Sequence, residues 1–512
     1  MYDVAIVGYG PTGMVLAALL GRMGHKVIVL ERYTGLYNLP RAACFDDEIM
    51  RVFQRLGIEN DILKGAVAQE KYDWVNAQGD ILVDFEYAKQ APGGWAALYM
   101  MFQPFIEDVL DKLDKNIETL EIRQGVTVNH VEQDESGVTL GGESADGTSV
   151  TVKARYVVGA DGGNGFLSRI VSSHADDYSF QENWLVCDFR MLKSVPDLPT
   201  FRQICDPVQP TSIVRIGPEH HRMSFMLNEG ETKEQATQPD SVWRRVSRYL
   251  NPENAELIRV VNYVFMSRIA DQWRKGKILL AGDSAHQMPP FLGQGMCSGI
   301  RDSLNLAWKL DLILNQKCSD AILDTYQPER EPHVRFITEK AIELGRIQTL
   351  RDTEKAKTRD AHFLALRDAQ KSPEKIKFPN LRNGLISDNG CFFPQAVVSV
   401  AGQSGLLDRF TKNGWLVINW SDTHFPVLDQ DVENILSTLQ AQKITFGESE
   451  EDHIMSDKAN IYKNWFERNE CLFAIIRPDW HVYGTAKNTS ELDSLILKLE
   501  SDLQLQVELS DV

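Results

Sequence analysis

The first thirty residues alternate between apolar runs and short polar breaks. An apolar run over residues 4–7 precedes a glycine-rich turn at 8–13, and apolar periodicity predicts a helix over Met14–Met23 before a second apolar run at Val27–Leu30. A strand, a tight turn, a helix and a returning strand of these lengths are typical of a parallel βαβ unit. We therefore expect the chain to open with a doubly wound α/β domain.

Strand and helix patterns are interleaved in the rest of the chain, so the predicted domains are discontinuous. Alternating strands follow an amphipathic helix at Gln103–Leu113, strand signals dominate from Trp184 to Leu227, and the α/β pattern returns at Lys277–Ala281 before a helix at Cys297–Asn315. Residues 318–372 are charged and helical. The predicted units are an α/β domain (1–75, 101–175 and 270–320), a β-sheet domain (76–100 and 176–269), a helical connection (321–380) and a C-terminal α/β domain (381–512).

The turn after the first strand carries a dinucleotide fingerprint, G-x-G-x-x-G, with an acidic residue closing the next strand. Gly8 permits the tight turn, Gly10 lets the backbone approach a pyrophosphate, and Gly13 lets the helix pack on the strand. Glu31 is placed to accept a hydrogen bond from a ribose 2'-hydroxyl and would repel a 2'-phosphate, which favours FAD or NAD over NADP. The alternative is a glycine-rich turn that binds no ligand.

Two further motifs indicate which dinucleotide is bound. The first is Gly159-Ala160-Asp161-Gly162 after a strand, and the second runs from Gly282-Asp283 through Pro290 to Gly293-Gln294-Gly295-Met296-Cys297 at a helix start. A carboxylate at a strand end suits a polyol, and backbone N–H groups at a helix N-terminus stabilise negative charge on a reduced flavin. Taken alone, the Asp283 motif has the alternative interpretation of a capped turn before a helix.

Charge and cysteine usage exclude several classes. The net charge of −18 and the pI near 5.1 disfavour nucleic acid and anionic membranes as partners. No apolar run reaches the length of a membrane helix, and the first strand leaves no room for a signal peptide, so a cytoplasmic protein is expected. The seven cysteines show no C-x-x-C spacing and the histidines no metal spacing, so we expect neither disulfide nor metal.

Together the three motifs resemble those of the single-component FAD-dependent aromatic hydroxylases, the class A flavoprotein monooxygenases. Over nearly the full length the chain is most similar to the 3-(3-hydroxyphenyl)propionate hydroxylase group, through Leu39–Ala42, Phe45–Arg51, Gln103-Pro104, Cys205–Pro207 and Arg477–Asp479. The resemblance implies a Rossmann-like FAD-binding domain interleaved with a β-sheet substrate domain, and a C-terminal thioredoxin-like α/β domain that lacks C-x-x-C.

This resemblance also implies the chemistry. NADH or NADPH, bound transiently, would reduce FAD, and O2 would form a flavin C4a-hydroperoxide that hydroxylates a phenolic or other electron-rich ring. Relatives are often dimers, so a homodimer is expected. A planar guanidinium such as Arg41 suits a pyrophosphate, although a solvated arginine is the alternative. The expected cofactor-binding residues are Gly8, Gly10, Pro11, Thr12, Gly13, Glu31, Arg32, Arg41, Gln103, Asp161, Gly282, Asp283, Pro290, Gly293, Gly295, Met296 and Cys297.

At several positions the chain departs from the family pattern. The D-G-x-x-S-x-x-R form has Gly165 in place of serine and Ser168 in place of arginine; Cys44 stands where relatives often have histidine; and a stretch that reads H-R-R-W-E-F in relatives is His220–Phe225 here. These changes suggest a differently shaped or less polar pocket, so the phenylpropionate substrate is not transferred to this chain.

The candidates for catalysis and substrate binding rest on weaker signals. A carboxylate among apolar neighbours, Asp188, is a candidate base or orienting group, with an ion pair to Arg190 or a role in a turn as the alternatives. His286 and Pro290 lie in the flavin motif, where the proline would form a rigid wall and the histidine has the alternative of capping local backbone. Arginines could hold an acidic or oxygen-rich substrate, or simply lie at the surface. The expected catalytic residues are His286, Pro290 and Asp188, and the expected substrate-binding residues are Cys44, Arg215, Arg222 and Met223.

Three functions stay open at this point. The leading one is hydroxylation of a phenol or phenolic acid. A variant is hydroxylation of a quinolone, pyridine or polyketide ring in the biosynthesis or inactivation of a bioactive compound. A function of another class is flavin binding without oxygenation.

Overall fold

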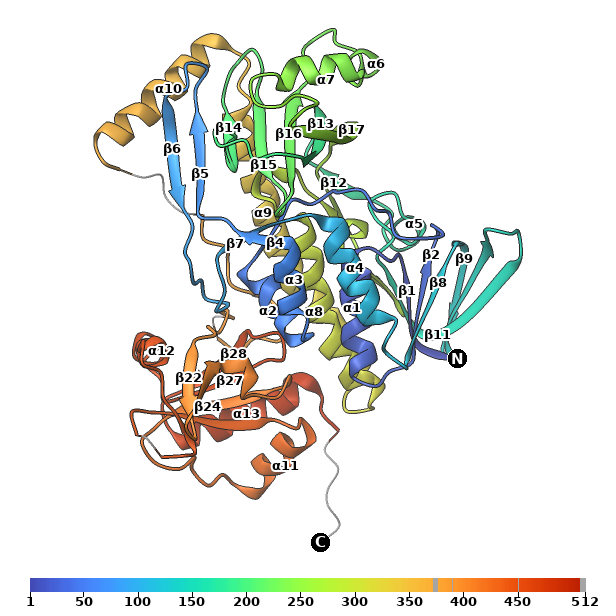
Figure 1. Ribbon diagram of the computed structural model, residues 1–512. Coiled ribbons are helices and arrows are strands. Elements are labelled where there is room, and N and C mark those ends of the chain that lie inside the picture. The colour runs from blue at the N-terminus through green and yellow to red at the C-terminus, as the bar shows by residue number, and fades with distance from the viewer. Residues whose placement is uncertain (372–375, 389, 450, 507–512) are drawn as a thin grey trace.

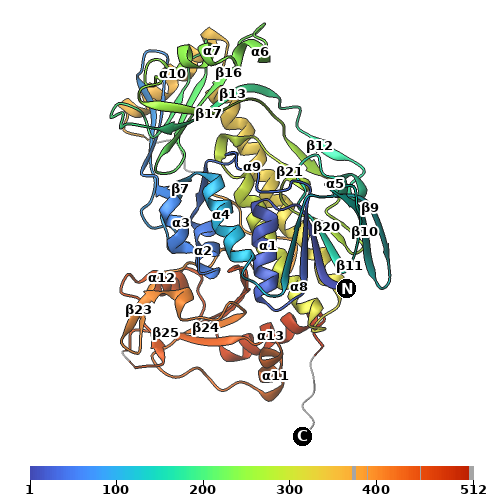
Figure 2. The same ribbon diagram turned by 45° about the vertical axis from the view of Figure 1, so that its right-hand side comes forward.

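The computed structural model describes residues 1–371, 376–388, 390–449 and 451–506. Figures 1 and 2 show three parts, with the α/β domain in the middle, a second β-sheet domain above it and the C-terminal domain below. A long helix, α9 (Tyr326–Gln348), runs between the upper two parts. Within the described ranges, no helix is long and apolar enough to cross a membrane.

A parallel sheet forms the centre of the α/β domain and confirms the predicted βαβ opening. Val4, Ala5 and Ile6 of its first strand are fully buried, as expected for a sheet covered on both faces. Helix α1 packs between α4 and α8. The sheet order is β19-β20-β11-β1-β2-β8, with the hairpin β9–β10 attached to β11. The bounds are β1 (Tyr2–Val7), α1 (Pro11–Arg22), β2 (Val27–Glu31), α4 (Gln103–Asp114), β8 (Leu120–Gln124), β9 (Val126–Asp134), β10 (Gly137–Ser144), β11 (Ser149–Gly159), β19 (Arg274–Lys275), β20 (Ile278–Leu280) and α8 (Gly295–Leu314).

Two small three-stranded sheets flank this domain, and each joins segments that are far apart in the sequence. One has the order β3-β7-β4 and the other β12-β18-β21. Their bounds, with those of the adjoining helices, are β3 (Cys44–Asp46), α2 (Asp47–Arg55), α3 (Glu59–Gly65), β4 (Ala66–Ala68), β7 (Leu98–Met101), α5 (Phe166–Val171), β12 (Ala175–Asp177), β18 (Arg268–Ala270) and β21 (His286–Gln287).

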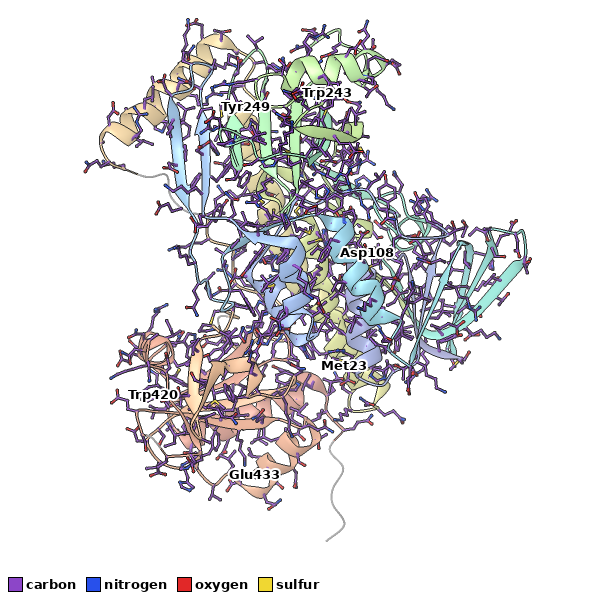
Figure 3. All side chains as sticks on the ribbon, viewed as in Figure 1. Met23, Asp108, Trp243, Tyr249, Trp420 and Glu433 are labelled. Carbon is purple, nitrogen blue, oxygen red and sulfur yellow. The ribbon has the colours of Figure 1, made fainter. Side chains whose placement is uncertain are left out.

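The sheet domain is one seven-stranded sheet with the order β17-β13-β16-β15-β14-β5-β6. Residues 71–75, predicted to lie in the α/β domain, form β5 and pair with β14, so the boundary falls earlier than expected. Trp243 and Tyr249 pack against the core on the outer face, and Figure 3 shows both in this upper part. The bounds are β5 (Lys71–Val75), β6 (Ile81–Glu86), β13 (Glu182–Met191), β14 (Phe201–Ile204), β15 (Thr211–Arg215), β16 (His220–Met226), α6 (Lys233–Ala236), α7 (Pro239–Val246) and β17 (Ala255–Phe265).

The predicted helical connection packs against this sheet. Its two helices are α9 and α10 (Thr353–Asp368), and α10 contacts β6. Phe363 of α10 meets Trp74 of β5 edge to face at 5.7 Å between ring centroids. Leu344 and Ile347 of α9 pack on the same cluster. These two helices therefore form one side of the space beside the sheet.

The C-terminal domain has a five-stranded sheet with the order β26-β25-β24-β27-β28. β24 is parallel to β25 and antiparallel to β27, which pairs with β28. This order, a βαβ unit followed by a ββα unit, is compatible with the thioredoxin-like domain, which stays a prediction. The bounds are β22 (Val397–Val400), β23 (Gln403–Leu406), β24 (Leu416–Trp420), α11 (Gln430–Thr438), β25 (Gln442–Phe446), β26 (Ile454–Met455), α12 (Ile461–Arg468), β27 (Phe473–Ile476), β28 (Val482–Ala486) and α13 (Thr489–Leu503).

Buried ionic contacts join the C-terminal domain to α8 and α9. Glu329 accepts hydrogen bonds from Lys309 at 2.9 Å and from Arg477 at 2.8 Å, and Arg477 also pairs with Asp479 at 2.6 Å. Burial lowers the pKa of Lys309 to about 8. Burial alone would raise the pKa of Glu329, but Arg477 and Lys309 outweigh it and lower this pKa to about 2. The four side chains therefore depend on one another for charge balance.

Candidate functional site

One large cavity extends from the α/β domain to the sheet domain. Its volume is 1830 Å³, about twice the upper end of the ~300–1,000 Å³ typical of a site for one small ligand. We call the part beside β1, β2 and α8 the nucleotide half, and the part beside the seven-stranded sheet the substrate half. The cavity has room for a dinucleotide and a second molecule.

Backbone geometry shapes the nucleotide half. Gly8 has φ +108°, which favours glycine, and a Cβ there would lie 2.2 Å from the carbonyl oxygen of Ala160. A Cβ on Gly13 would lie 2.1 Å from the carbonyl oxygen of Gly8, whereas one on Gly10 would meet only Arg41, at 3.7 Å. The N-terminus of α1 therefore faces the cavity with room for phosphate groups beside it.

Glu31 and Gln103 organise the loops around this half. The Glu31 carboxylate lines the cavity and accepts hydrogen bonds from the backbone N–H groups of Tyr9 at 2.7 Å and Tyr33 at 2.9 Å. The side-chain oxygen of Gln103 accepts hydrogen bonds from the backbone N–H of Ala42 at 2.6 Å and of Arg41 at 3.2 Å. Gln103 thus fixes the loop that presents the Arg41 guanidinium to the cavity.

Asp283 faces the cavity from a turn that a buried network holds. Its carboxylate has no hydrogen-bond partner among the described residues, and burial within the fold raises its pKa. Behind it, Asp302 accepts hydrogen bonds from the backbone N–H of Gly282 at 3.0 Å and from Arg330 at 2.9 Å, and lies 2.6 Å from the Nε2 of His286. Asp283 is therefore available to a ligand hydroxyl, whereas His286 supports the turn from behind.

Asp161 ties the second motif to the third. It accepts hydrogen bonds from Ser284 at 2.9 Å and from the backbone N–H of Leu167 at 3.0 Å. A Cβ on Gly165 would lie 2.0 Å from its Oδ1. Glycine at 165, where the family pattern has serine, therefore leaves room for this carboxylate.

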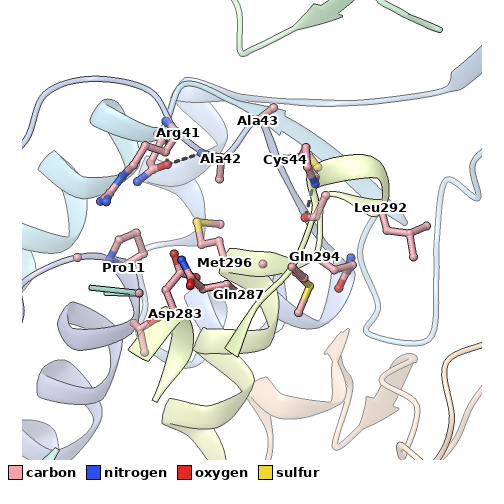
Figure 4. Close-up of a pocket in the computed structure, with 18 of the residues that line it drawn as sticks. Pro11, Arg41, Ala42, Ala43, Cys44, Asp283, Gln287, Leu292, Gln294 and Met296 are labelled. Atoms are coloured by element: carbon pink, nitrogen blue, oxygen red, sulfur yellow. Dashed lines mark hydrogen bonds between the residues drawn. The ribbon is translucent and has the colours of Figure 1, made fainter. Parts of the chain in front are cut away.

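The start of α8 closes the cavity floor between the two halves. Figure 4 shows Pro11, Arg41, Asp283 and Met296 around one space, with Cys44 to one side. The Cys44 thiol lies 3.8 Å from the carbonyl oxygen of Gly293, and its burial, with Asp46 nearby, raises its pKa to about 12. The thiol therefore stays protonated at neutral pH and acts as a small apolar wall.

The substrate half is lined mainly by aromatic and aliphatic side chains from one face of the sheet. Trp184 and Val186 of β13 point into it, while the alternate residues Leu185 and Cys187 pack into the core on the opposite face. Phe291, from the short helix at Pro290–Leu292, meets Trp184 edge to face at 6.1 Å. Other residues that line this half are Tyr72, Trp74, Phe85, Phe201, Val214, Val261, Tyr263, Phe265, Met288, Leu344, Ile347 and Phe363.

Asp188 lies on the same face of β13 as Trp184 and Val186, but two arginines separate it from the cavity. It is fully buried, directly opposite Arg222 on one neighbouring strand and Arg259 on the other. Its carboxylate accepts a hydrogen bond from Arg222 at 2.7 Å and lies 3.6 Å from Arg259. Arg222 also donates to the carbonyl oxygens of Arg41 at 2.7 Å and Pro40 at 3.0 Å, and Arg259 donates to that of Pro40. These hydrogen bonds attach the loop that carries Arg41 to the sheet.

Most of the predicted cofactor residues surround the cavity, and Gly13, Gly282 and Cys297 lie just behind its wall. Asp188 and His286 do not line the cavity, and the predicted Asp188–Arg190 pair does not form, since Arg190 pairs with Glu256. The predicted residues that line the cavity are Gly8, Gly10, Pro11, Thr12, Glu31, Arg32, Arg41, Cys44, Gln103, Asp161, Arg222, Asp283, Pro290, Gly293, Gly295 and Met296.

For Arg215 and Met223 the structure corrects the expected contact with substrate. Met223 packs in the core on the other face of the sheet, because neighbours on a strand point to opposite faces. Arg215 donates to the carbonyl oxygens of Gly217 at 3.1 Å and Pro218 at 3.3 Å and so closes its own turn. In the described ranges, one group of potential metal ligands has suitable spacing, His424 with Glu451 and His453, and it is exposed outside the cavity.

The sequence analysis missed most of the side chains that shape the substrate half. Gln203 and Ser212 line it although neither was singled out, and Gln348 reaches it from α9. Strand alternation provides part of the signal, because Trp184, Val186 and Asp188 share a face. Which residues of separate strands meet depends on register, which one sequence does not reveal.

Family profiles cover most of the chain. One, described as an FAD binding domain, matches residues 1–341, and another, described as an HcaD C-terminal domain, matches residues 390–501. A "probable NADH-specific resorcinol 4-hydroxylase" of Rhodococcus jostii (strain RHA1) is 51% identical over 97% of this chain and 94% of that protein. A "3-(3-hydroxy-phenyl)propionate/3-hydroxycinnamic acid hydroxylase" of Escherichia coli (strain K12) is 29% identical over 99% of this chain and 97% of its own.

Solved structures share the fold over nearly the whole chain. The flavin-dependent monooxygenase PieE, in complex with FAD and substrate, has a TM-score of 0.81 at 19% identity, covering 98% of this chain and 99% of its own. Aklavinone-11 hydroxylase, in a ternary complex with FAD and aklavinone, has a TM-score of 0.78 at 20% identity with the same coverage.

Proposed function

Because the chain belongs to the FAD binding domain family and is a flavin-dependent aromatic hydroxylase, we propose that its substrate is a small neutral dihydroxybenzene such as resorcinol and that NADH is its electron donor. One observation carries the proposal: both arginines that the sheet presents to the substrate half are already paired with Asp188. The 51% sequence identity to a probable resorcinol 4-hydroxylase also supports the proposal.

The residues of the nucleotide half fit FAD. When bound there, FAD would supply the redox chemistry that couples oxidation of NADH by O2 to hydroxylation of an aromatic ring. The N-terminus of α1, with the open face of Gly10, would hold the pyrophosphate, and Glu31 would accept from a ribose hydroxyl. Asp283, which has no partner among the described residues, would accept from a ribityl hydroxyl. The N–H groups at the start of α8 would stabilise negative charge on the flavin ring.

The substrate half would orient a flat aromatic ring and exclude water from it. Its aromatic walls offer stacking and edge contacts, and Phe291 with Trp184 and Phe265 closes the side toward α9. Excluding water protects the activated oxygen from loss as peroxide. The chain's part in the chemistry is therefore orientation of the ring and control of solvent.

Charge separates this chain from hydroxylases of phenolic acids. A carboxylate in a closed apolar site needs a free cation, because an unpaired buried charge is costly. The sheet contributes two cations to the cavity lining, Arg222 and Arg259, and Asp188 and backbone oxygens occupy both. Lys377, from outside the sheet, also lines the cavity but is exposed to solvent. A neutral phenol therefore fits this half better than an acid does.

The test is NADH consumption by the purified holoenzyme with resorcinol, 3-(3-hydroxyphenyl)propionate and a polycyclic phenol in parallel. We expect resorcinol to stimulate NADH oxidation most and to yield a product heavier by one oxygen atom. Preference for the acid would contradict the proposed substrate class. Preference for the polycyclic phenol would favour the alternative of a polyketide ring. Oxidation without any oxygenated product would favour a flavin protein that does not hydroxylate.

Two further expectations belong to this proposal. The homodimer that the family resemblance implies and the cytoplasmic location expected from the sequence stay predictions. Sedimentation of the holoenzyme would test the dimer, and a single species with the mass of one chain would contradict it.

A further inference from the structure

Three neutral polar side chains form a continuous row across the cavity face of the sheet. Gln203 of β14 lies directly opposite Ser212 of β15, which lies opposite Ser224 of β16. The row continues through Val186 of β13 on one side and Trp74 of β5 on the other. All five side chains line the substrate half. The three polar residues are therefore adjacent in space although 21 positions separate the first from the last in sequence.

These three side chains have unused hydrogen-bonding capacity. Gln203 is 2% exposed, and its side-chain nitrogen makes a long hydrogen bond of 3.3 Å to the backbone of Ile204. Among the described residues, neither its side-chain oxygen nor the hydroxyl of Ser212 or Ser224 has a partner. Buried polar groups are normally satisfied, so this row needs a polar ligand or water in the cavity.

The surroundings limit what that ligand can be. The row lies among aromatic side chains, with Phe201 and Tyr72 stacked at 3.9 Å beside Gln203 and Trp184 beside Val186. The row itself contains no cation. Serine and glutamine can both donate and accept, as a hydroxyl does, whereas the charge of a carboxylate would have no cation in the row to offset it.

We infer that Gln203, Ser212 and Ser224 bind the second hydroxyl group of a dihydroxybenzene, and so select it over phenols that lack that group. The inference rests on the proposed function and deepens it. A site built to hydrogen-bond a substrate hydroxyl rejects the analogue without it, because its own polar groups are then left unpaired. Family relatives have glutamate in the stretch that carries Ser224, so the uncharged side chain here is consistent with an uncharged partner.

The test compares resorcinol with 3-methylphenol, which has a similar shape and one hydroxyl fewer. In the wild-type holoenzyme we expect kcat/KM to favour resorcinol. In Gln203→Leu and in the double variant Ser212→Ala/Ser224→Ala, that preference should fall on the order of tenfold for each hydrogen bond lost, through KM for resorcinol. The constants for 3-methylphenol and the FAD content should stay near those of the wild type. Calorimetric titration with resorcinol should show the same weakening.

Two controls keep the outcome specific. Ile213 lies next to Ser212 on β15 but faces the core on the other side of the sheet. Ile213→Val should therefore leave the preference for resorcinol unchanged. Ser224→Thr retains a hydroxyl and should retain most of the preference. Equal losses for both substrates in the alanine and leucine variants, or an unchanged preference, would overturn the inference.

Failure of the inference is distinguishable from failure of the proposed function. If wild-type enzyme neither binds nor hydroxylates any dihydroxybenzene, the proposed function is wrong. If wild type prefers resorcinol and the variants keep that preference, only the assignment of this row is wrong.

Discussion

The two halves of the cavity are built by different means. In the nucleotide half, backbone groups from three short motifs do most of the shaping, through glycines and helix N-termini. In the substrate half, side chains from seven strands and two helices meet across the sheet. A site made of backbone is tied to local sequence, whereas a site made of side chains depends on strand register. The following predictions challenge this contrast, beginning with the largest expected effect.

Asp188→Ala should be the most damaging single change in the substrate half. It leaves Arg222 and Arg259 buried without their carboxylate, and breaking such a pair costs about 3–5 kcal/mol of the free energy of unfolding. Denaturant unfolding of the holoenzyme measures this loss. The control is Glu256→Gln, which removes the half-exposed ion pair between Glu256 and Arg190, a residue of the same strand as Asp188. This change should lower the free energy of unfolding by less than about 1 kcal/mol. Equal losses of unfolding free energy in the two variants would contradict the larger contribution expected of the buried cluster.

Gly13→Ala should damage the nucleotide half through backbone contact alone. Its Cβ would lie 2.1 Å from the carbonyl oxygen of Gly8, so α1 must shift, at about 3 kcal/mol. Flavin content after desalting should fall sharply, and the melting temperature should fall with it. A matched variant is Gly35→Ala, where a Cβ meets nothing within 4 Å. Full flavin content in Gly13→Ala would contradict the close-packing role.

Asp283→Ala should weaken FAD binding without unfolding the chain. A hydrogen bond from a ligand hydroxyl to a carboxylate contributes about 2 kcal/mol, so the Kd for FAD should rise more than tenfold. Fluorescence titration of apoprotein with FAD measures this Kd, and circular dichroism checks the fold. A variant that keeps all its flavin through desalting would contradict the role of Asp283.

Met223→Leu should have the smallest effect. Its side chain packs in the core behind the sheet, and a volume-conserving core change usually costs less than about 1.5 kcal/mol. KM for resorcinol should be unchanged, because the cavity is untouched. A changed KM would show that packing behind the sheet is transmitted to the substrate half.

The contrast explains what the sequence could and could not predict. Gly8, Glu31 and Asp283 could be predicted as cofactor-binding residues because each lies in a contiguous motif whose spacing is set by one turn or one strand, and all three line the cavity. Met223 was misplaced because it was chosen as a departure from the family pattern, whereas strand alternation turns it to the face opposite Arg222 and Ser224. Asp188 was noticed, but its partners are 34 and 71 positions away. Only strand order brings them together.

Domain boundaries follow the same logic. The βαβ opening and helix α8 agree closely with their predicted ranges, because local periodicity defines them. Residues 71–75 were assigned to the α/β domain, whereas β5 pairs with β14 of the other sheet, more than a hundred residues later. The ionic cluster around Glu329 was missed because its members come from α8, α9 and the C-terminal domain.

That cluster has a consequence for the size of the smallest active protein. Lys309 belongs to α8, whose first turn lies at the cavity, while Arg477 and Asp479 lie past the family boundary at residue 390. A chain shortened to its first 380 residues would keep the Glu329–Lys309 pair but would lose Arg477 and Asp479, which lie against the helix whose first turn is at the cavity. We therefore expect the last quarter of the molecule to be needed for a stable, active hydroxylase, so that a chain cut at the domain boundary is less stable than the full chain.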